Sequence, residues 1–114
     1  MTIKIVKQQL SKNELETIAQ EIFGFMVKAA VDIEKKLLAL GGEWHSQCQE
    51  ALIENGSFSG DIWGINILCD APKEKRIEYI SLINIKPNFG HRKMEVENPE
   101  IKEKIEQIIN ELVE

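Results

Sequence analysis

Apolar residues near the start of the chain follow two different patterns. Ile3 and Ile5 alternate with Lys4, which predicts a short strand. Ser11 and Glu14 have the spacing of a capping box, in which each side chain can bond the backbone N–H of the other residue. An apolar stripe at helical spacing follows: Leu15, Ile18, Ala19, Ile22 and Met26. A short strand and then a helix are therefore expected.

The stretch from residue 25 to residue 45 carries two overlapping patterns. Its apolar residues can continue the helical stripe, which would give one helix from Lys12 to Leu40, about 43 Å long in a domain about 30–35 Å across. The same residues also alternate between apolar and polar, which predicts strands 28–34 and 37–43. Two lysines suit the tight turn between these strands poorly. We favour the hairpin because of the helix length and the β-branched residues.

The second half of the chain predicts shorter elements. Ser46 and Gly56 bound a short helix. Residues 61–70 and 76–87 are rich in Ile, Tyr and Trp on either side of a turn-like segment, so they should pair as an antiparallel hairpin. Alternation along that hairpin would put these residues in the core: Trp63, Ile65, Ile67, Cys69, Ile77, Tyr79, Ile83 and Ile85.

The last element and the predicted architecture follow from the remaining pattern. Asn98 can cap a helix that begins at Pro99 and runs to about Val113. Together the elements predict an α+β fold with an antiparallel or mixed sheet of about four to five strands and helices packed on one face. Residues 1–114 are expected to form a single domain, as the length alone suggests.

Composition and charge narrow the function classes. No run of ~18 apolar residues exists, and the first residues lack the features of a secretory signal, so a cytoplasmic protein without membrane contact is expected. Cys48 and Cys69 form no spaced motif and are expected to be reduced. The net charge of −5 makes a nucleic-acid partner an unfavourable interpretation, although the sequence does not exclude one.

Two asparagines in predicted strands are candidate binding residues. Asn66 and Asn84 are unusual there because asparagine has a low strand propensity. They can face water or bond a neighbouring loop, and that is the simpler interpretation. They can also line a pocket beside Gly64, which leaves room for a ligand or for backbone.

Histidines and cations supply the other candidates. His45 follows Glu43 and precedes Cys48, but this spacing is unspecific, so no metal site and no cofactor are predicted. The segment 86–93 contains no acidic residue. Its basic side chains could hold an anionic ligand or an acidic partner, and they are Lys86, His91, Arg92 and Lys93. The simpler interpretations are a packed or capping histidine and a solvated turn. Convergence of His45, Asn66, Asn84 and Arg92 around a concavity would identify a functional site.

The chain resembles a family of small bacterial proteins known only as a domain of unknown function. The resemblance covers nearly the whole chain and is carried by "MVKAAVDIEKKLLALGGEWH", "ENGS", "DIWGINI" and "SLINIKPNFGHRKMEVENPEI". It implies a bacterial cytosolic protein and a hairpin turn at Lys35-Lys36, where the family usually has a glycine. The family has acidic residues after the histidine where this chain has Ser46, Gln47 and Cys48, which weakens a metal site. The resemblance implies no activity.

Three functions compete on this evidence. The first is a non-catalytic binding module for an anionic ligand or a protein partner, using Asn66, Asn84, Lys86, Arg92 and Lys93. The second is a small toxin-like ribonuclease in which His45 or His91 is the acid or base and Arg92 and Lys86 stabilise the developing charge. The third is a dimerising structural protein, which the long-helix interpretation would favour. Whether the chain is an enzyme stays open at this point, and a homodimer is compatible with each function.

Overall fold

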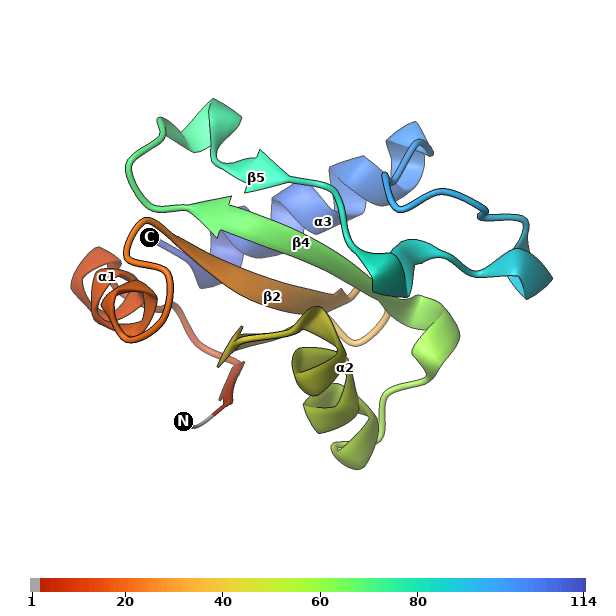
Figure 1. Ribbon diagram of the computed structural model, residues 1–114, viewed down its shortest axis with the longest axis horizontal. Coiled ribbons are helices and arrows are strands. Elements are labelled where there is room, and N and C mark those ends of the chain that lie inside the picture. The colour runs from red at the N-terminus through yellow and green to blue at the C-terminus, as the bar shows by residue number, and fades with distance from the viewer. Residues whose placement is uncertain (1–2) are drawn as a thin grey trace.

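The computed structural model describes residues 3–114 as a five-stranded antiparallel sheet with helices on both faces (Figure 1). The first two residues of the predicted domain lie outside the described residues. The α+β class is thus confirmed. The strands are β1 (Lys4–Val6), β2 (Met26–Asp32), β3 (Leu37–Gly42), β4 (Ile62–Leu68) and β5 (Ile77–Glu78). The α-helices are α1 (Lys12–Gln20), α2 (His45–Glu54) and α3 (Pro99–Leu112), and short 3-10 turns are η1 (Ser59–Asp61), η2 (Lys73–Lys75), η3 (Leu82–Asn84) and η4 (Pro87–Phe89).

The stretch 26–42 forms the hairpin of β2 and β3 and no long helix. The Asp32 carboxylate makes the lysine turn workable, because its Oδ1 accepts bonds of 2.9 Å from the backbone N–H groups of Glu34 and Lys35. Lys36 takes the left-handed conformation that this turn requires, with φ 57°. Asp32 is fully buried, and its second oxygen accepts a 2.6 Å bond from the Ser57 hydroxyl. The hairpin prediction is therefore confirmed, with Asp32 supplying the missing turn chemistry.

The strand order β1-β3-β2-β4-β5 puts the hairpin at the centre of the sheet. Both faces of its strands are buried, so the helices divide between two faces, whereas the sequence predicted one. The larger core cluster joins α1 and α3 to the face that carries Val31, Leu38 and Trp63. The smaller cluster seats α2 on Ala30 and Ala39, whose small side chains let the helix approach closely. Successive strand residues point to opposite faces, which is why one strand serves both cores.

The predicted strand 76–87 is wrong beyond its start. Only Ile77 and Glu78 pair with β4 as a strand, and the chain then turns through η3. Ile83 consequently packs in the α2 cluster on the other face from its predicted position, and Ile85 is 39% exposed. The backbone pairing of β4 with the following segment stops because a side chain takes over its hydrogen bonds. The Asn84 carboxamide accepts from the Gly64 N–H at 2.7 Å and donates to the Gly64 carbonyl at 3.0 Å, as a paired strand residue would do.

The other helices begin near the predicted residues. The capping box of Ser11 and Glu14 is present at α1, and Asn98 caps α3 through bonds to the N–H groups of Glu100 and Ile101. Helix α2 begins one residue earlier than predicted, because the Gln47 side chain accepts from the N–H groups of Glu43 and Trp44. None of the helices within residues 3–114 is long and apolar enough to cross a membrane.

Candidate functional site

His45 is the first residue of α2, and its ring is anchored to the centre of the sheet. Its Nε2 lies 2.9 Å from the Ile65 carbonyl oxygen and 2.9 Å from Asn66 Oδ1. A carbonyl oxygen and a carboxamide oxygen can only accept hydrogen bonds. His45 Nε2 must therefore carry the proton that it donates to them. Nδ1 then keeps a free lone pair in the neutral imidazole. His45 thus lies against the sheet, three residues after the end of β3.

Asn66 links that histidine to the neighbouring strands. It is only 8% exposed, and its Nδ2 donates to Glu78 Oε1 at 3.2 Å while its Oδ1 faces His45. The register places Lys28, Asn66 and Glu78 side by side across β2, β4 and β5. A mid-strand asparagine is therefore explained by a polar row on the part of the sheet that α2 leaves uncovered.

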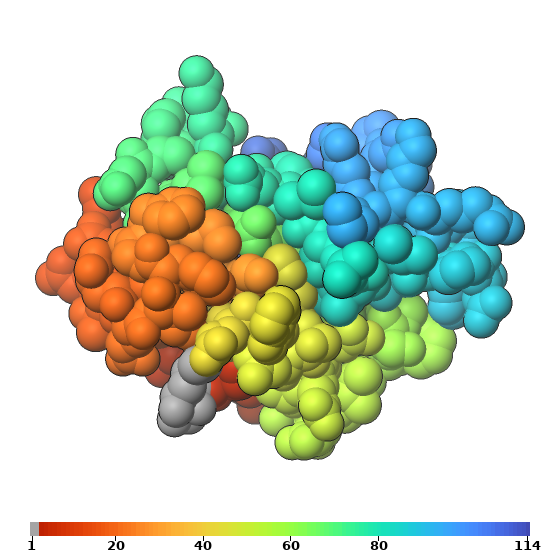
Figure 2. All heavy atoms as spheres, viewed as in Figure 1, coloured from red at the N-terminus to blue at the C-terminus, as the bar shows by residue number. Residues whose placement is uncertain are grey.

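A hollow of about 270 Å³ opens beside this polar row. Figure 2 shows it near the centre of one face, between segments coloured orange (β2), yellow (the start of α2) and teal (the segment after β5). The hollow is lined by Lys28, Trp44, His45, Ser46, Ser81, Leu82 and Ile83. Two of the lining side chains are large, apolar and strongly exposed, Trp44 at 62% and Leu82 at 72%. Exposed apolar side chains that adjoin one another, unlike isolated ones, are a feature of interaction surfaces.

The Lys28 ammonium is the positive charge of the hollow. Its Nζ lies 5.3 Å from the centroid of the Trp44 ring and 5.4 Å from that of Phe23. These cation–π contacts hold the exposed indole and the ammonium together. The free N–H groups of the first turn of α2 add a partial positive charge at the same place, because a helix leaves its first amides without acceptors inside the helix.

Burial shifts the pKa values of two titratable groups near the hollow, His45 and Cys48. Burial lowers the pKa of His45, although its bonds to Ile65 and Asn66 oppose the shift. Burial raises the pKa of the Cys48 thiol to about 11, so the thiolate nucleophile is absent at neutral pH. The Cys48 sulfur instead donates to the Lys28 carbonyl at 3.7 Å. A neutral imidazole and an ammonium are left as the main polar groups.

The lowered pKa of His45 predicts a pH-dependent stability. The unfolded chain has an imidazole pKa of about 6.5, above that of the folded protein, so it binds more protons below that pH. The contribution of His45 to stability is full above about pH 6.5 and is lost as the pH falls toward the lower folded pKa. We expect the free energy of unfolding to fall more steeply on acidification in the wild type than in His45→Gln. Urea denaturation at a series of pH values measures it, and equal slopes would contradict the assignment.

Asn84 is buried, and its side chain joins separate segments of the chain by hydrogen bonds. It is fully buried, and besides its two bonds to Gly64 its Nδ2 donates to the Met94 carbonyl at 2.9 Å. These three bonds join β4, η3 and the segment before α3. Gly64 is needed at this point because a Cβ there would lie 2.5 Å from that of Ser81. Asn84 therefore supports the wall of the hollow from behind and does not share a hollow with His45.

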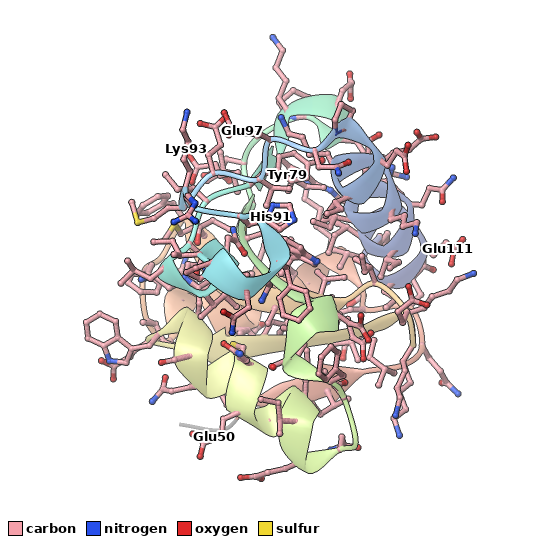
Figure 3. The ribbon with its side chains drawn as sticks, turned by 90° about the vertical axis from the view of Figure 1, so that its right-hand side faces the viewer. Glu50, Tyr79, His91, Lys93, Glu97 and Glu111 are labelled. Atoms are coloured by element: carbon pink, nitrogen blue, oxygen red, sulfur yellow. The ribbon has the colours of Figure 1, made fainter. Side chains whose placement is uncertain are left out.

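The predicted cationic segment 86–93 is spread over different environments. Lys86 turns inward and is 8% exposed, whereas Lys93 forms an exposed ion pair with Glu97 at 3.3 Å. The His91 ring packs edge-to-face on Trp63, with ring centroids 4.7 Å apart, and Arg92 is exposed. Figure 3 shows His91 and Lys93 on one side of the molecule, well away from Glu50 on α2.

The two histidines do not share a site. Trp63, which His91 contacts, belongs to the core on the α1 and α3 side of the sheet, and Asn66, which holds His45, points to the α2 side. Of the predicted residues, the structure thus brings together His45 and Asn66. It leaves Asn84, Arg92 and the lysines of the 86–93 segment outside this hollow.

Several residues of the hollow were missed by the sequence pattern. Lys28 has the pattern of an ordinary solvent-facing strand position, as does Glu78 in the adjoining polar row, and Leu82 was assigned to a strand although it lies in η3. Trp44 carried one usable signal, since a tryptophan in the short connection between two glycines and a helix has few neighbours that could bury it. Their convergence depends on the register between β2, β4 and β5.

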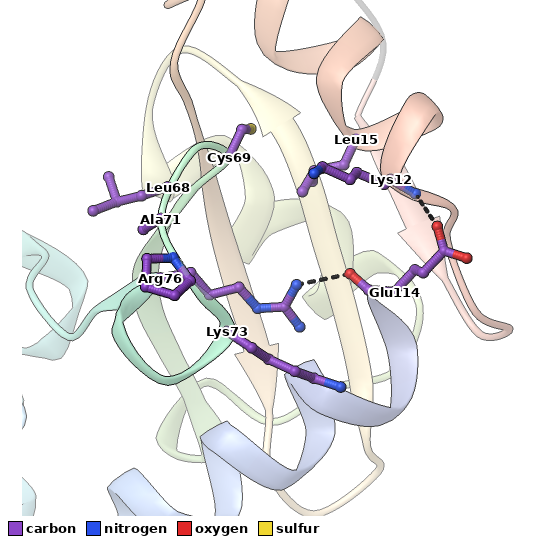
Figure 4. A pocket seen from close by; sticks show the side chains of 9 residues that line it. Lys12, Leu15, Leu68, Cys69, Ala71, Lys73, Arg76 and Glu114 are labelled. Atoms are coloured by element: carbon purple, nitrogen blue, oxygen red, sulfur yellow. Dashed lines mark hydrogen bonds between the residues drawn. The ribbon is translucent and has the colours of Figure 1, made fainter.

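Another hollow, of about 250 Å³, lies at the far end of β4 (Figure 4). Arg76 crosses it and donates from Nη1 to the Glu114 backbone oxygen at 2.8 Å and from Nη2 to the Val113 oxygen at 3.0 Å. The Glu114 side chain in turn accepts from the Lys12 N–H at 2.9 Å. These bonds tie the segment after β4 to the end of α3 and the start of α1, which gives this hollow a structural explanation. Within residues 3–114 no group of three or more His, Cys, Asp or Glu residues could hold a metal ion.

Comparison with known proteins identifies a family. The model of a family described as "Protein of unknown function (DUF5674)" matches residues 4–112, nearly the whole chain. No curated protein and no solved structure matches the chain. The resemblance to a family without an assigned activity is confirmed by this match. The hairpin, the polar row and the hollow all lie within the matched residues, and the chain belongs to the protein family of unknown function DUF5674.

Proposed function

We propose that the protein is a non-catalytic binding module that docks a protein partner on its His45 face, defined by Lys28, Trp44, His45, Ile80 and Leu82. The observation that carries this proposal is a hollow with a hydrogen-bonded polar floor beside apolar side chains that solvent reaches. Trp44 and Leu82 line the hollow, and Ile80, 41% exposed, follows Glu78 on the same side of the chain. Exposed aromatic and aliphatic groups around a small pocket are typical of the centre of a protein interface.

The size of the hollow favours a protein partner over a small molecule. Its volume of about 270 Å³ is below the about 300–1,000 Å³ of most ligand pockets. A molecule that filled only this space would leave Ile80 and much of Trp44 in water. A partner surface would cover them and place one of its side chains in the hollow.

Charge indicates which side chain the partner inserts. Lys28 and the first-turn amides of α2 favour a negative charge, and a carboxylate can accept bonds from both. The neutral His45 ring offers Nδ1 as an acceptor to a backbone N–H of the partner. The occupant that fits is an acidic residue flanked by apolar ones in a segment of another protein.

Titration of the purified protein with a capped peptide that has glutamate between leucine and phenylalanine tests the proposal. Trp44 fluorescence reports binding, because the other tryptophan, Trp63, is only 3% exposed. We expect saturable binding, about tenfold weaker for the peptide with glutamine in place of glutamate and about tenfold weaker for Leu82→Ala. Ile53→Ala removes another exposed apolar side chain, from the far end of α2, and should leave the affinity unchanged.

Two outcomes would overturn this assignment. Equal affinity for the glutamate and glutamine peptides, or no binding of either, excludes an acidic partner segment. A dimer in light scattering that Leu82→Ala disperses would make a second copy of the chain the occupant. The ribonuclease alternative with His45 as acid or base is not favoured, because neither Lys86 nor Arg92 lines the hollow beside His45.

A further inference from the structure

A second hollow lies on the other side of Ile83 from the His45 face. Ile83 lines both hollows, so it forms the wall between them. The second hollow has a volume of about 320 Å³, within the about 300–1,000 Å³ usual for small-molecule sites. Its lining includes Gln49 of α2, Ser59, Ile85, Lys86 and Phe89. We call it the Lys86 hollow.

The Lys86 ammonium is part of its wall. Lys86 is 8% exposed, and its Nζ donates to the carbonyl oxygens of Ser59 at 3.0 Å and Ile83 at 3.2 Å. Both acceptor residues line the hollow, so the charged group lies between them at its edge. The Trp63 ring covers another side, with its centroid 5.0 Å from Nζ. The ammonium is therefore held in place by its surroundings before any ligand arrives.

Among the described residues this buried ammonium has no ion-pair partner. Within residues 3–114 no carboxylate oxygen lies within 4.0 Å of Lys86 Nζ, and the acid that acts on it, Asp61, does so from beyond that distance. An ammonium has three N–H donors, and two of them are used by carbonyl oxygens. Lysine is almost never buried to this extent without an opposite charge. An anion in the adjoining hollow would supply one.

The remaining walls indicate what the anion is attached to. Phe89 is 56% exposed and packs edge-to-face on Phe58, with ring centroids 6.1 Å apart. Ile85, which also lines the hollow, is 39% exposed. These surfaces suit a flat apolar body, since an aromatic ring stacks favourably on a phenylalanine. No acid lines the hollow.

We propose that the Lys86 hollow binds a small aromatic carboxylate, with its carboxylate on the third N–H of Lys86 and its ring against Phe89 and Ile85. This site is independent of the partner surface proposed above, because Ile83 and α2 separate the two. The ligand exchanges water for a charge-assisted hydrogen bond in a partly dry site, where such bonds are strong.

Titration with phenylacetate, followed by heteronuclear NMR of the backbone amides, tests this inference, and phenylacetamide serves as the neutral probe of the same shape. We expect saturable shifts in residues 58–60 and 83–89 and an affinity for phenylacetate at least about tenfold higher than for the amide. Lys86→Met, which keeps the length of the side chain, should remove that preference. Lys75→Met is the matched control and should keep it, since Lys75 lies outside this hollow.

Phe89→Ala keeps the test valid if Lys86→Met fails to fold. Its ring is mostly exposed, so the variant should fold and weaken both probes by about threefold to tenfold while the preference for the acid persists. The proposal is overturned by equal affinities for acid and amide, by shifts confined to the His45 face, or by no saturation at the solubility limit of phenylacetate.

Discussion

Asn84→Ala is expected to lower the free energy of unfolding by about 3 kcal/mol or more. The carboxamide makes three bonds, to the N–H and carbonyl of Gly64 and to the carbonyl of Met94. The residue is fully buried, so water cannot replace those bonds. Each abandoned backbone group then costs about 1–3 kcal/mol. Urea denaturation followed by circular dichroism measures the change.

Asn88→Ala is the matched control for this prediction. Asn88 is exposed and lies only four residues further along the chain, and no side-chain hydrogen bond is found for it within residues 3–114. Its replacement should change the free energy of unfolding by no more than about 0.5 kcal/mol. If Asn84→Ala costs less than about 1 kcal/mol, the view that its side chain replaces a strand ladder is wrong.

Gly64→Ala is expected to cost about 2–3 kcal/mol by overpacking the same contact. A Cβ at Gly64 would lie 2.5 Å from Ser81 Cβ, 2.6 Å from Ser81 Oγ and 2.8 Å from Ile83 Cγ1. The chain there cannot retreat easily, because the bonds of Asn84 hold η3 against β4. The reason for glycine is therefore the close approach of the Ser81 and Ile83 side chains and no special torsion angle. Thermal or urea unfolding measures the loss.

Gly60→Ala separates this steric effect from the general cost of replacing glycine. A Cβ at Gly60 would meet only the Phe58 ring, which is 58% exposed and can turn away. We expect a change within about 0.5 kcal/mol for this variant. Similar losses in the two variants would mean that the Gly64 contact has no special role.

Both substitutions also bear on the proposed function. Segment 81–83 contributes Ser81, Leu82 and Ile83 to the hollow beside His45, and Ile83 separates it from the Lys86 hollow. Asn84 holds that segment on β4, so its bonds place an exposed leucine where a partner can reach it. An exposed segment of a binding surface needs such hydrogen bonds from beneath, because no other part of the protein packs over it to fix its geometry.

The elements predicted correctly are those with a local chemical signal. The capping box at Ser11 and the Asn98-Pro99 start of α3 involve residues within one helical turn, so their consequences can be read directly. The hairpin of β2 and β3 followed from alternation and from the length that one helix would have reached. His45 lies against the sheet because it follows the end of β3 by three residues and contacts the Ile65 carbonyl oxygen of β4.

What only the tertiary structure decided is how equivalent-looking residues differ in role. Asn66 and Asn84 have the same strand context in the sequence, yet one faces His45 and the other is bonded to Gly64 some 20 residues away. The strand after Ile77 ended early for the same reason, since its pairing was taken over by a side chain. The alternation of apolar and polar residues indicates which face of a strand is apolar. Which residue a side chain contacts on a neighbouring strand depends instead on the register of the strands and on the course of the loops between them. Those are set by packing between segments that are distant in the chain, and no local periodicity encodes them.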